Sequence, residues 1–176
     1  MLIRYEHERK CFYAILEKEG QHSQKIMEMK RDYYGSEDTG LYREDTGYAG
    51  IHTPQDLYDA LREVWCEYTC TPRMRKDYSK ENMTLGQCAV TAFLAQDIFG
   101  GEVYGIPLEE GGVHCFNIVK GHVFDLTSAQ FREMLDYDNA TPQDRNIHFL
   151  RKEKEERWLF LKQKLQDYCK QQTGDR

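Results

Sequence analysis

No apolar run in this sequence approaches the length that crosses a membrane, and the first ten residues carry charges where a signal peptide needs apolar ones. The chain has no basic stripe with interleaved aromatic residues, and its formal net charge is -6, so nucleic acid is not an expected partner. Because there is no phosphate-binding glycine loop and no dinucleotide fingerprint, no cofactor is expected. These absences predict a cytoplasmic protein without a membrane or nucleic-acid partner.

The cysteines show no framework of paired spacings. Six of them are scattered along 176 residues, which is typical of reduced thiols in a reducing compartment. Apolar residues make up 40% of the chain and charged residues 31%, so one domain with a substantial core is expected.

The first 50 residues differ in composition from the remainder. Residues 5–31 are highly charged with a weak apolar stripe, which predicts one or two surface helices. Residues 32–50 hold five acidic residues and four glycines, which is typical of a loop or flexible linker. We therefore predict a helical extension with an acidic linker over residues 1–50, followed by a folded domain over residues 51–176.

Two helices are clearly signalled in the folded domain. Thr53 and Pro54 suit a helix start, and the apolar face that follows continues to Tyr68. A second helix is predicted from about Thr84 to the Gly100–Gly101 pair. Because apolar residues surround nearly all of it, we expect this second helix to be the buried centre of the domain.

Three strands are predicted after the central helix, over residues 102–107, 113–119 and 122–127. A short helix over residues 128–135 and a long helix over residues 152–171 follow. Elements of these types in this order predict an α+β fold, in which helices pack on a small antiparallel sheet.

Cys88 stands in the first turn of the predicted central helix. Unpaired N–H groups and the positive end of the helix dipole stabilise a thiolate at that position and lower its pKa. A cysteine nucleophile also needs an imidazole to share its proton and a carboxylate to orient that imidazole. The alternative is that Cys88 only fills space in a buried helix, since cysteine is among the most buried residue types.

A predicted β-hairpin after this helix contains the two residues that complete the set. If Lys120–Gly121 is a two-residue turn, His114 and Asp125 are diagonal neighbours on one face, within side-chain reach. An aspartate within an apolar strand is also costly to bury without a partner. We therefore expect His114 to bond Asp125, either in a catalytic set with Cys88 or as a purely structural pair.

Gln87 has two candidate roles beside this set. Its amide has the chemistry to help stabilise an oxyanion, together with backbone N–H groups at the helix start. It also follows Thr84 by three residues, which is the spacing of a capping box. We favour the cap, and we assign the oxyanion chiefly to the backbone N–H of Cys88.

The motifs around these residues resemble those of the YunG-like family of small, largely uncharacterised bacterial proteins. The matching segments are Gly86–Ala92, Gln96–Gly101, His114–Asn117 and Phe124–Thr127, and Trp65 in the preceding helix also fits. Two residues depart from the usual aromatic pair, namely Cys115 and Phe116. The resemblance covers residues 54–172, so residues 1–50 are an addition outside the family core.

The order of helix cysteine, strand histidine and strand aspartate is also similar to that of transglutaminase-like and NlpC/P60-like proteins. This resemblance implies a papain-like core and acyl transfer or amide hydrolysis through a thioester, on a small-molecule or peptide substrate. Cys88 would then be the nucleophile, His114 the general base and acid, and Asp125 the orienting group. Asn117 would be a polar helper, although the hairpin register places it on the face opposite His114.

Two other interpretations stay open. A papain-like domain can serve as a catalytically inactive binding module, in which case Cys88 would be inert and have an ordinary pKa. The third interpretation is a small zinc-binding protein, with ligands from Cys66, Cys70 and the His114–Cys115 pair. The usual two-residue spacing within each cysteine pair is missing, which weakens the zinc interpretation.

Overall fold

The computed structural model describes residues 32–109 and 111–174, so the helices predicted within residues 5–31 lie outside the described residues. The helices are α3 (Pro54–Val64), η1 (Pro72–Asp77), η2 (Lys80–Asn82), α4 (Cys88–Phe99), η3 (Ser128–Gln130), α5 (Arg145–His148) and α6 (Lys152–Gly174). The strands are β1 (Glu102–Pro107), β2 (Val113–Val119), β3 (His122–Phe124) and β4 (Thr141–Pro142). This content confirms the predicted α+β class. Within the described ranges, no helix combines the length and apolar character needed to cross a bilayer.

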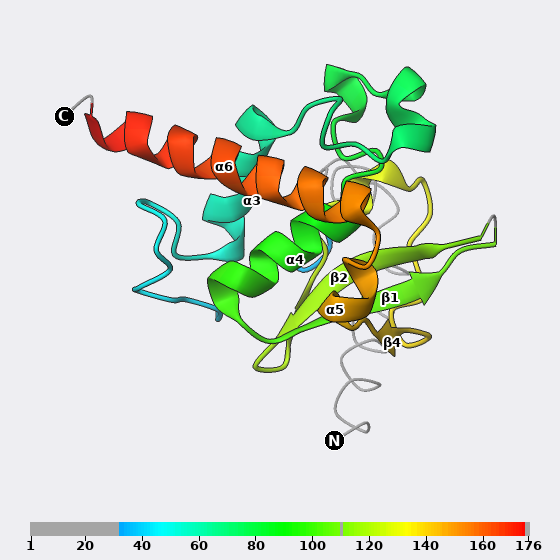
Figure 1. Ribbon diagram of the computed structural model, residues 1–176. Coiled ribbons are helices and arrows are strands. Elements are labelled where there is room, and N and C mark those ends of the chain that lie inside the picture. The colour runs from blue at the N-terminus through cyan, green and yellow to red at the C-terminus, as the bar shows by residue number, and fades with distance from the viewer. Residues whose placement is uncertain (1–31, 110, 175–176) are drawn as a thin grey trace, which may run out of the picture. The chain divides into compact units, whose positions relative to one another are not determined.

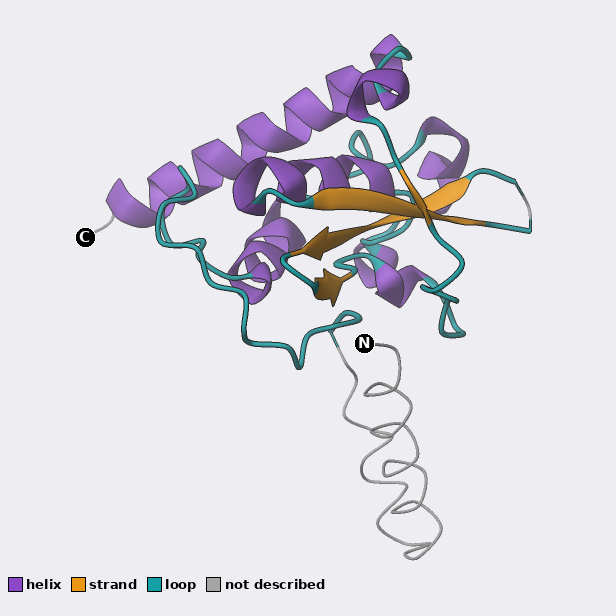
Figure 2. Ribbon diagram, turned by 90° about the horizontal axis from the view of Figure 1, so that it is seen from below, coloured by secondary structure: helices purple, strands orange, loops and turns teal. Residues whose placement is uncertain are grey.

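The strands form one antiparallel sheet in the order β3–β2–β1–β4. Helix α4 packs on the sheet at β2, and α6 packs on both α3 and α4. Figure 1 shows α4 between α6 and the strands, and Figure 2 shows the long helices on one side of the sheet. The central position predicted for the cysteine-bearing helix is therefore confirmed.

The hairpin of β2 and β3 has the predicted register. Lys120 and Gly121 occupy the two-residue turn with φ of 53° and 88°, and Val119 pairs with His122. Two positive φ values in succession match the twist of antiparallel strands, and glycine adopts such a φ without steric cost. The second strand is shorter than predicted, because the backbone of Asp125 bridges Tyr34 instead of β2.

Helix α3 begins as predicted and ends early. Thr53 and Asp56 form a reciprocal capping box at its start. The helix ends at Val64, because Trp65 adopts extended backbone with ψ of 139°. The indole Nε1 of Trp65 then donates to Thr91 Oγ1 at 3.0 Å, which ties this end to α4.

Helix α4 begins at Cys88, four residues later than predicted. Gly86 has φ of 65°, and the N–H of Gln87 bonds the Thr84 carbonyl in a tight turn, so residues 84–87 are not helical. An added Cβ on Gly86 would lie 2.8 Å from Cys70 Sγ, so glycine is required at this close approach. Cys88 is consequently the first residue of the helix. At the other end, α4 stops before Gly100 as predicted.

The prediction of a short helix over residues 128–135 is wrong. Only the 3₁₀ turn η3 forms there, and Met134, placed on the expected apolar face, is 75% exposed. Phe131 instead packs edge-on against His114, with 4.7 Å between ring centroids. Helix α6 follows the prediction, and its buried face carries Leu161 and Leu165.

The described part of the acidic segment packs into the domain. Residues 32–50 form no helix or strand beyond the bridge at Tyr34, which agrees with the predicted loop. Three of its apolar side chains are nevertheless buried in the main core, at Tyr33, Leu41 and Tyr48. Residues 32–109 and 111–174 belong to one compact unit. The domain boundary predicted at residue 50 stays a prediction. Residues 32–50 contribute side chains to the same hydrophobic core as the domain predicted over residues 51–176.

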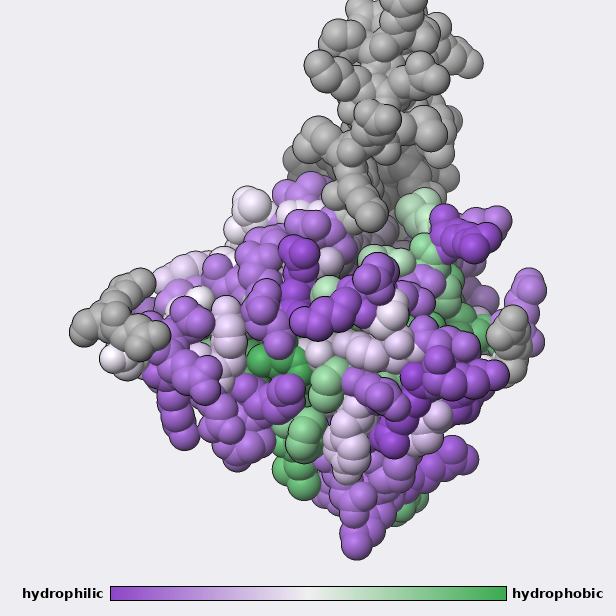
Figure 3. All heavy atoms as spheres, turned by 90° about the horizontal axis from the view of Figure 1, so that it is seen from above, coloured by the Kyte–Doolittle hydropathy of each residue, from purple (hydrophilic) through white to green (hydrophobic). Residues whose placement is uncertain are grey.

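Charged side chains dominate the outer surface. The face drawn in Figure 3 is largely hydrophilic, with apolar residues confined to small areas. A few large apolar side chains are exposed, including Leu159 and Phe160 on α6. Phe160 packs edge-on against Tyr68, which is also exposed.

Substitution of Gly35 tests how the acidic segment packs on β3. Gly35 has φ of +87°, and an added Cβ would lie 2.2 Å from the carbonyl oxygen of Val123. We expect Gly35→Ala to lower the free energy of unfolding by about 3 kcal/mol in urea denaturation. Gly47 has φ of +74° with open space around it, so Gly47→Ala is the control and costs about 1 kcal/mol. Equal losses would contradict the close packing of Gly35 on β3.

Candidate functional site

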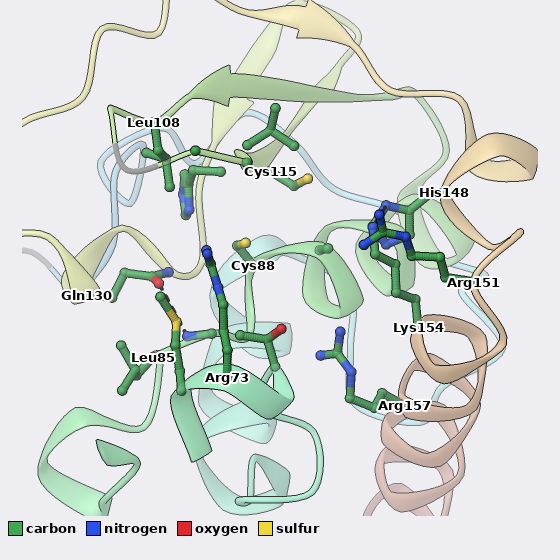
Figure 4. A pocket seen from close by; sticks show the side chains of 18 of the residues that line it. Arg73, Leu85, Cys88, Leu108, Cys115, Gln130, His148, Arg151, Lys154 and Arg157 are labelled. Carbon is green, nitrogen blue, oxygen red and sulfur yellow. Dashed lines mark hydrogen bonds between the residues drawn. The ribbon is translucent and has the colours of Figure 1, made fainter. Parts of the chain in front are cut away.

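A cavity of about 900 Å³ opens at the start of α4. Cys88, His114 and Cys115 all line it, so the N-terminal end of α4 and the first residues of β2 meet there. Cys88 is half-buried and reaches the cavity, whereas His114 and Cys115 are almost fully buried in its wall. Figure 4 shows the Cys88 sulfur pointing into the cavity. The sequence-predicted nucleophile is therefore accessible to a small molecule.

The structure brings His114 and Asp125 together as the hairpin register predicts. Nε2 of His114 lies 2.5 Å from Oδ2 of Asp125, and both side chains are at most 1% exposed. The other ring nitrogen, Nδ1, is buried and has no hydrogen-bond partner of ordinary geometry in the described part of the chain. The hydrogen bond at Nε2 thus orients the imidazole, and Nδ1 is left to exchange a proton with Cys88.

Asp125 is held by more donors than the sequence predicted. Its Oδ1 accepts hydrogen bonds from the N–H and the hydroxyl of Thr127, at 3.0 and 3.1 Å. Its Oδ2 accepts a second hydrogen bond from the Tyr137 hydroxyl, at 2.9 Å. Burial and the Asp125 charge raise the pKa of Tyr137, so its hydroxyl stays a donor. Sequence reasoning missed Tyr137, because it lies in an irregular segment with no periodic signal.

The two groups nearest the cavity have pKa values shifted in opposite directions. The neighbouring Cys115 thiol, and then the neighbouring His114 with its charge, lower the pKa of Cys88 well below its ordinary value despite burial. Burial disfavours the charged imidazole, but the hydrogen bond and charge of Asp125, with Cys88, raise the pKa of His114 to about 10. Both shifts favour a thiolate on Cys88 and an imidazolium on His114 over the neutral thiol and imidazole.

Cys115 is the second residue that sequence reasoning missed. Its side chain faces α4, in a small apolar cluster with Ala92, Phe93 and Val103, as the alternation of β2 requires. The neighbouring Cys88, followed by burial, raises the pKa of Cys115 well above its ordinary value. Cys115 therefore keeps its proton, and its thiol lies beside Cys88, where an S–H group can stabilise a thiolate.

Loss of this donor should make Cys88 less reactive. We expect Cys115→Ala to slow alkylation of Cys88 by iodoacetamide at pH 6 by about tenfold, because a thiolate that accepts one fewer hydrogen bond is less populated. The rate is read by peptide mass spectrometry on the native protein. Cys169→Ala removes a buried thiol that lies on α6 and not in the cavity wall, so this control should leave the rate unchanged. Equal rates in all three proteins would exclude Cys115 as a donor.

Neither candidate amide lines the cavity. Gln87 is fully buried and its Nε2 donates to the Cys66 carbonyl at 3.1 Å, so the predicted capping box with Thr84 does not form. Its Oε1 is buried without a hydrogen-bond partner in the described residues. Asn117 lies on the α4 side of the sheet, as the register predicts, and donates to the Ala92 carbonyl at 2.8 Å. Asn117 thereby fixes α4 on the sheet.

Backbone donors are available where an oxyanion would form. The first intrahelical hydrogen bond of α4 runs from the N–H of Thr91 to the carbonyl of Gln87. The N–H groups of residues 88–90 therefore precede the i to i−4 ladder and stand at the positive end of the helix. An oxygen that gains negative charge beside Cys88 would meet these groups.

A zinc site finds no ligand set in this part of the chain. Among the described residues, no group of three or more His, Cys, Asp or Glu side chains is arranged to hold a metal ion. The thiol of Cys70 is buried and contacts the Thr71 carbonyl at 3.5 Å, and burial raises its pKa to about 11. A cysteine binds zinc as a thiolate, so the raised pKa of Cys70 disfavours that role.

Comparisons with known proteins agree on one family. A family model described as "YunG protein" matches residues 53–170, a range that includes all three residues of the candidate set. A Bacillus subtilis (strain 168) protein described as "Uncharacterized protein YunG" is 32% identical over 90 residues, which cover 51% of this chain and 72% of that protein. No solved structure matches the chain.

Proposed function

The chain belongs to the YunG family, and we propose that it is a thiol-dependent hydrolase or acyltransferase that acts through a cysteine thioester. The observation that carries the proposal is the position of Cys88, at the first residue of α4 and in the mouth of a cavity that His114 also lines. The hydrogen bond from His114 to Asp125 supports it further, because it orients the imidazole and favours its charged form.

In the first half-reaction, the Cys88 thiolate attacks the carbonyl carbon of an amide or ester. A carbon–sulfur bond forms, and the carbonyl oxygen takes up the negative charge next to the N–H groups of residues 88–90. When the tetrahedral intermediate collapses, the bond to the leaving amine or alcohol breaks. His114 gives its proton to that leaving group, which leaves a thioester on Cys88 and a neutral imidazole.

In the second half-reaction, water or an acceptor amine attacks the thioester. Neutral His114 accepts the proton of the attacking group, and the Cys88 sulfur departs as a thiolate with its electron pair. Water gives net hydrolysis, and an amine gives acyl transfer. Asp125 stabilises the imidazolium in both halves, and it is in turn held by Thr127 and Tyr137.

A papain-like core is part of the proposal. The order of cysteine on the central helix, histidine on β2 and aspartate after β3 supports it, as does the packing of α4 on an antiparallel sheet. Fold resemblance alone does not define a reaction, so the proposal depends on the chemistry at Cys88. The expected substrate is a small molecule or a peptide, as the volume of the cavity allows.

The test is the pH dependence of alkylation at each cysteine, read by peptide mass spectrometry on the native protein. An unperturbed thiol titrates near pH 8.5, so Cys88 should react with iodoacetamide well below that pH. In His114→Ala the reactivity of Cys88 at pH 6 should fall by about 100-fold, while the other cysteines are unaffected. Protection of Cys88 until the protein unfolds would instead support the inactive binding module.

A further inference from the structure

Basic side chains gather in the walls of the cavity. Arg73 from η1 points into the cavity toward Cys88, and Arg151, Lys154 and Arg157 gather where α6 begins (Figure 4). The same walls carry two carboxylates, from Glu109 and Glu153. The whole chain has the opposite balance, with 24 basic and 30 acidic residues. Positive charge is therefore concentrated at the cavity of an acidic protein.

These basic residues are not all neutralised by neighbours. Arg157 is buried, pairs with Glu153 through Nε, and donates to the Thr69 carbonyl at 2.9 Å. Within residues 32–109 and 111–174, neither Arg73 nor Arg151 forms a hydrogen bond or ion pair with an acidic side chain. Two guanidinium groups are thus free to bind a ligand.

Lys154, one of the basic residues that line the cavity, acts on both His148 and Cys115. Its Nζ lies 3.4 Å from Nδ1 of His148, and its charge acts on Cys115, whose thiol lies beside Cys88. Burial and the charges of Lys154, Arg157 and Arg151 lower the pKa of His148 to about 4, so this histidine is neutral. A neutral His148 leaves Lys154 and Arg151 as basic groups of this part of the cavity lining.

We propose that the substrate carries a carboxylate or phosphate group near the carbonyl that Cys88 attacks, and that Arg73 beside Cys88, or Arg151 and Lys154 beside His148, bind this anion. The inference rests on the proposed function, because it describes the substrate of the same cavity. Guanidinium groups match the geometry of both anions, since each offers paired N–H donors to two oxygens. The basic side chains of the cavity also attract an anionic substrate before it binds.

Two alkylating reagents that differ mainly in charge test the inference at Cys88 itself. Iodoacetate and iodoacetamide form the same carbon–sulfur bond and release the same iodide, but only iodoacetate is an anion. We expect the iodoacetate-to-iodoacetamide rate ratio at Cys88 to exceed that of N-acetylcysteine amide by about tenfold at low salt. The preference should decline in 1 M NaCl, because salt screens partly exposed charges.

Matched variants show whether the named residues cause the preference. Arg73→Gln and the double variant Arg151→Gln, Lys154→Gln should each bring the ratio several-fold closer to the reference thiol. Lys152 lies on the same turn of α6, with an 87% exposed side chain outside the cavity walls, so Lys152→Gln should keep the wild-type ratio. A wild-type ratio equal to the reference, or the same drop in Lys152→Gln, would overturn the inference.

A binding measurement on Cys88→Ser separates this inference from the proposed reaction. Glutarate, inorganic phosphate and neutral glutaramide are titrated by calorimetry, and an anion is expected to bind with Kd below about 1 mM while glutaramide does not. The tighter anion identifies the group on the substrate. Slow reaction of Cys88 with both alkylating reagents would refute the proposed reaction, whereas absence of anion binding would refute the basic site.

Discussion

Replacing Asp125 with alanine is expected to lower the free energy of unfolding by about 4 kcal/mol, a large part of the stability of a small domain. The substitution leaves the imidazole of His114 buried without the carboxylate that bonds it, and burial alone lowers the pKa of that imidazole. It also removes the acceptor of the Tyr137 hydroxyl and of two donors on Thr127. Urea denaturation followed by tryptophan fluorescence measures the loss.

The chain contains a second His–Asp pair that serves as a control. His122 Nδ1 lies 2.6 Å from Asp38 Oδ2, but these side chains are 30% and 41% exposed. Because exposed ion pairs contribute little, Asp38→Ala should cost less than about 1 kcal/mol. Asp125→Asn is the second variant: it keeps an acceptor oxygen and removes the charge, so the pKa of His114 measured by NMR should fall. A loss at Asp125 no larger than that at Asp38 would contradict the buried network.

The contact between His114 and Asp125 could be predicted because the hairpin register is a local property. A two-residue turn at Lys120–Gly121 defines which residues stand opposite each other, and strand alternation then defines the shared face. The same alternation correctly placed Cys115 and Asn117 on the other face. The sequence did not indicate that Cys115, at the start of β2, would still reach Cys88.

The errors concern segments whose path depends on distant contacts. The helix predicted over residues 128–135 had adequate local pattern, but Phe131 packs on His114 and Tyr137 bonds Asp125, which the extended path allows. Tertiary packing outweighed local propensity in that segment. Likewise, the capping spacing before α4 is overridden by Gln87, which bonds the Cys66 carbonyl. The basic side chains around the cavity were not predicted as a group, because Arg73 lies far in sequence from residues 151–157.

The pKa shifts of Cys88 and His114 have opposite effects on how stability depends on pH. The pKa of His114 is raised from 6.5 to about 10, so its contribution is complete below pH 6.5 and is lost as the pH rises through 10. The pKa of Cys88 is lowered, so its contribution is complete above the ordinary thiol value and is lost as the pH falls through its folded value. At a pH above 6.5, below the ordinary thiol pKa and above the lowered pKa of Cys88, folding moves one proton from Cys88 to His114, and the two slopes cancel.

Cys88→Ser should therefore change the pH profile of stability by about 2 kcal/mol. Serine does not ionise in this range, so only His114 titrates, and the free energy of unfolding should decline from about pH 6.5 to pH 8.5 relative to the unsubstituted protein. Urea denaturation at each pH gives the two curves, and groups such as His148 cancel because they titrate in both proteins. Cys169→Ser is the matched control, since burial raises the pKa of that thiol and its curve should stay parallel. If Cys88→Ser also stays parallel, Cys88 is a neutral thiol in the folded protein, and the ion pair on which the proposed reaction depends does not form.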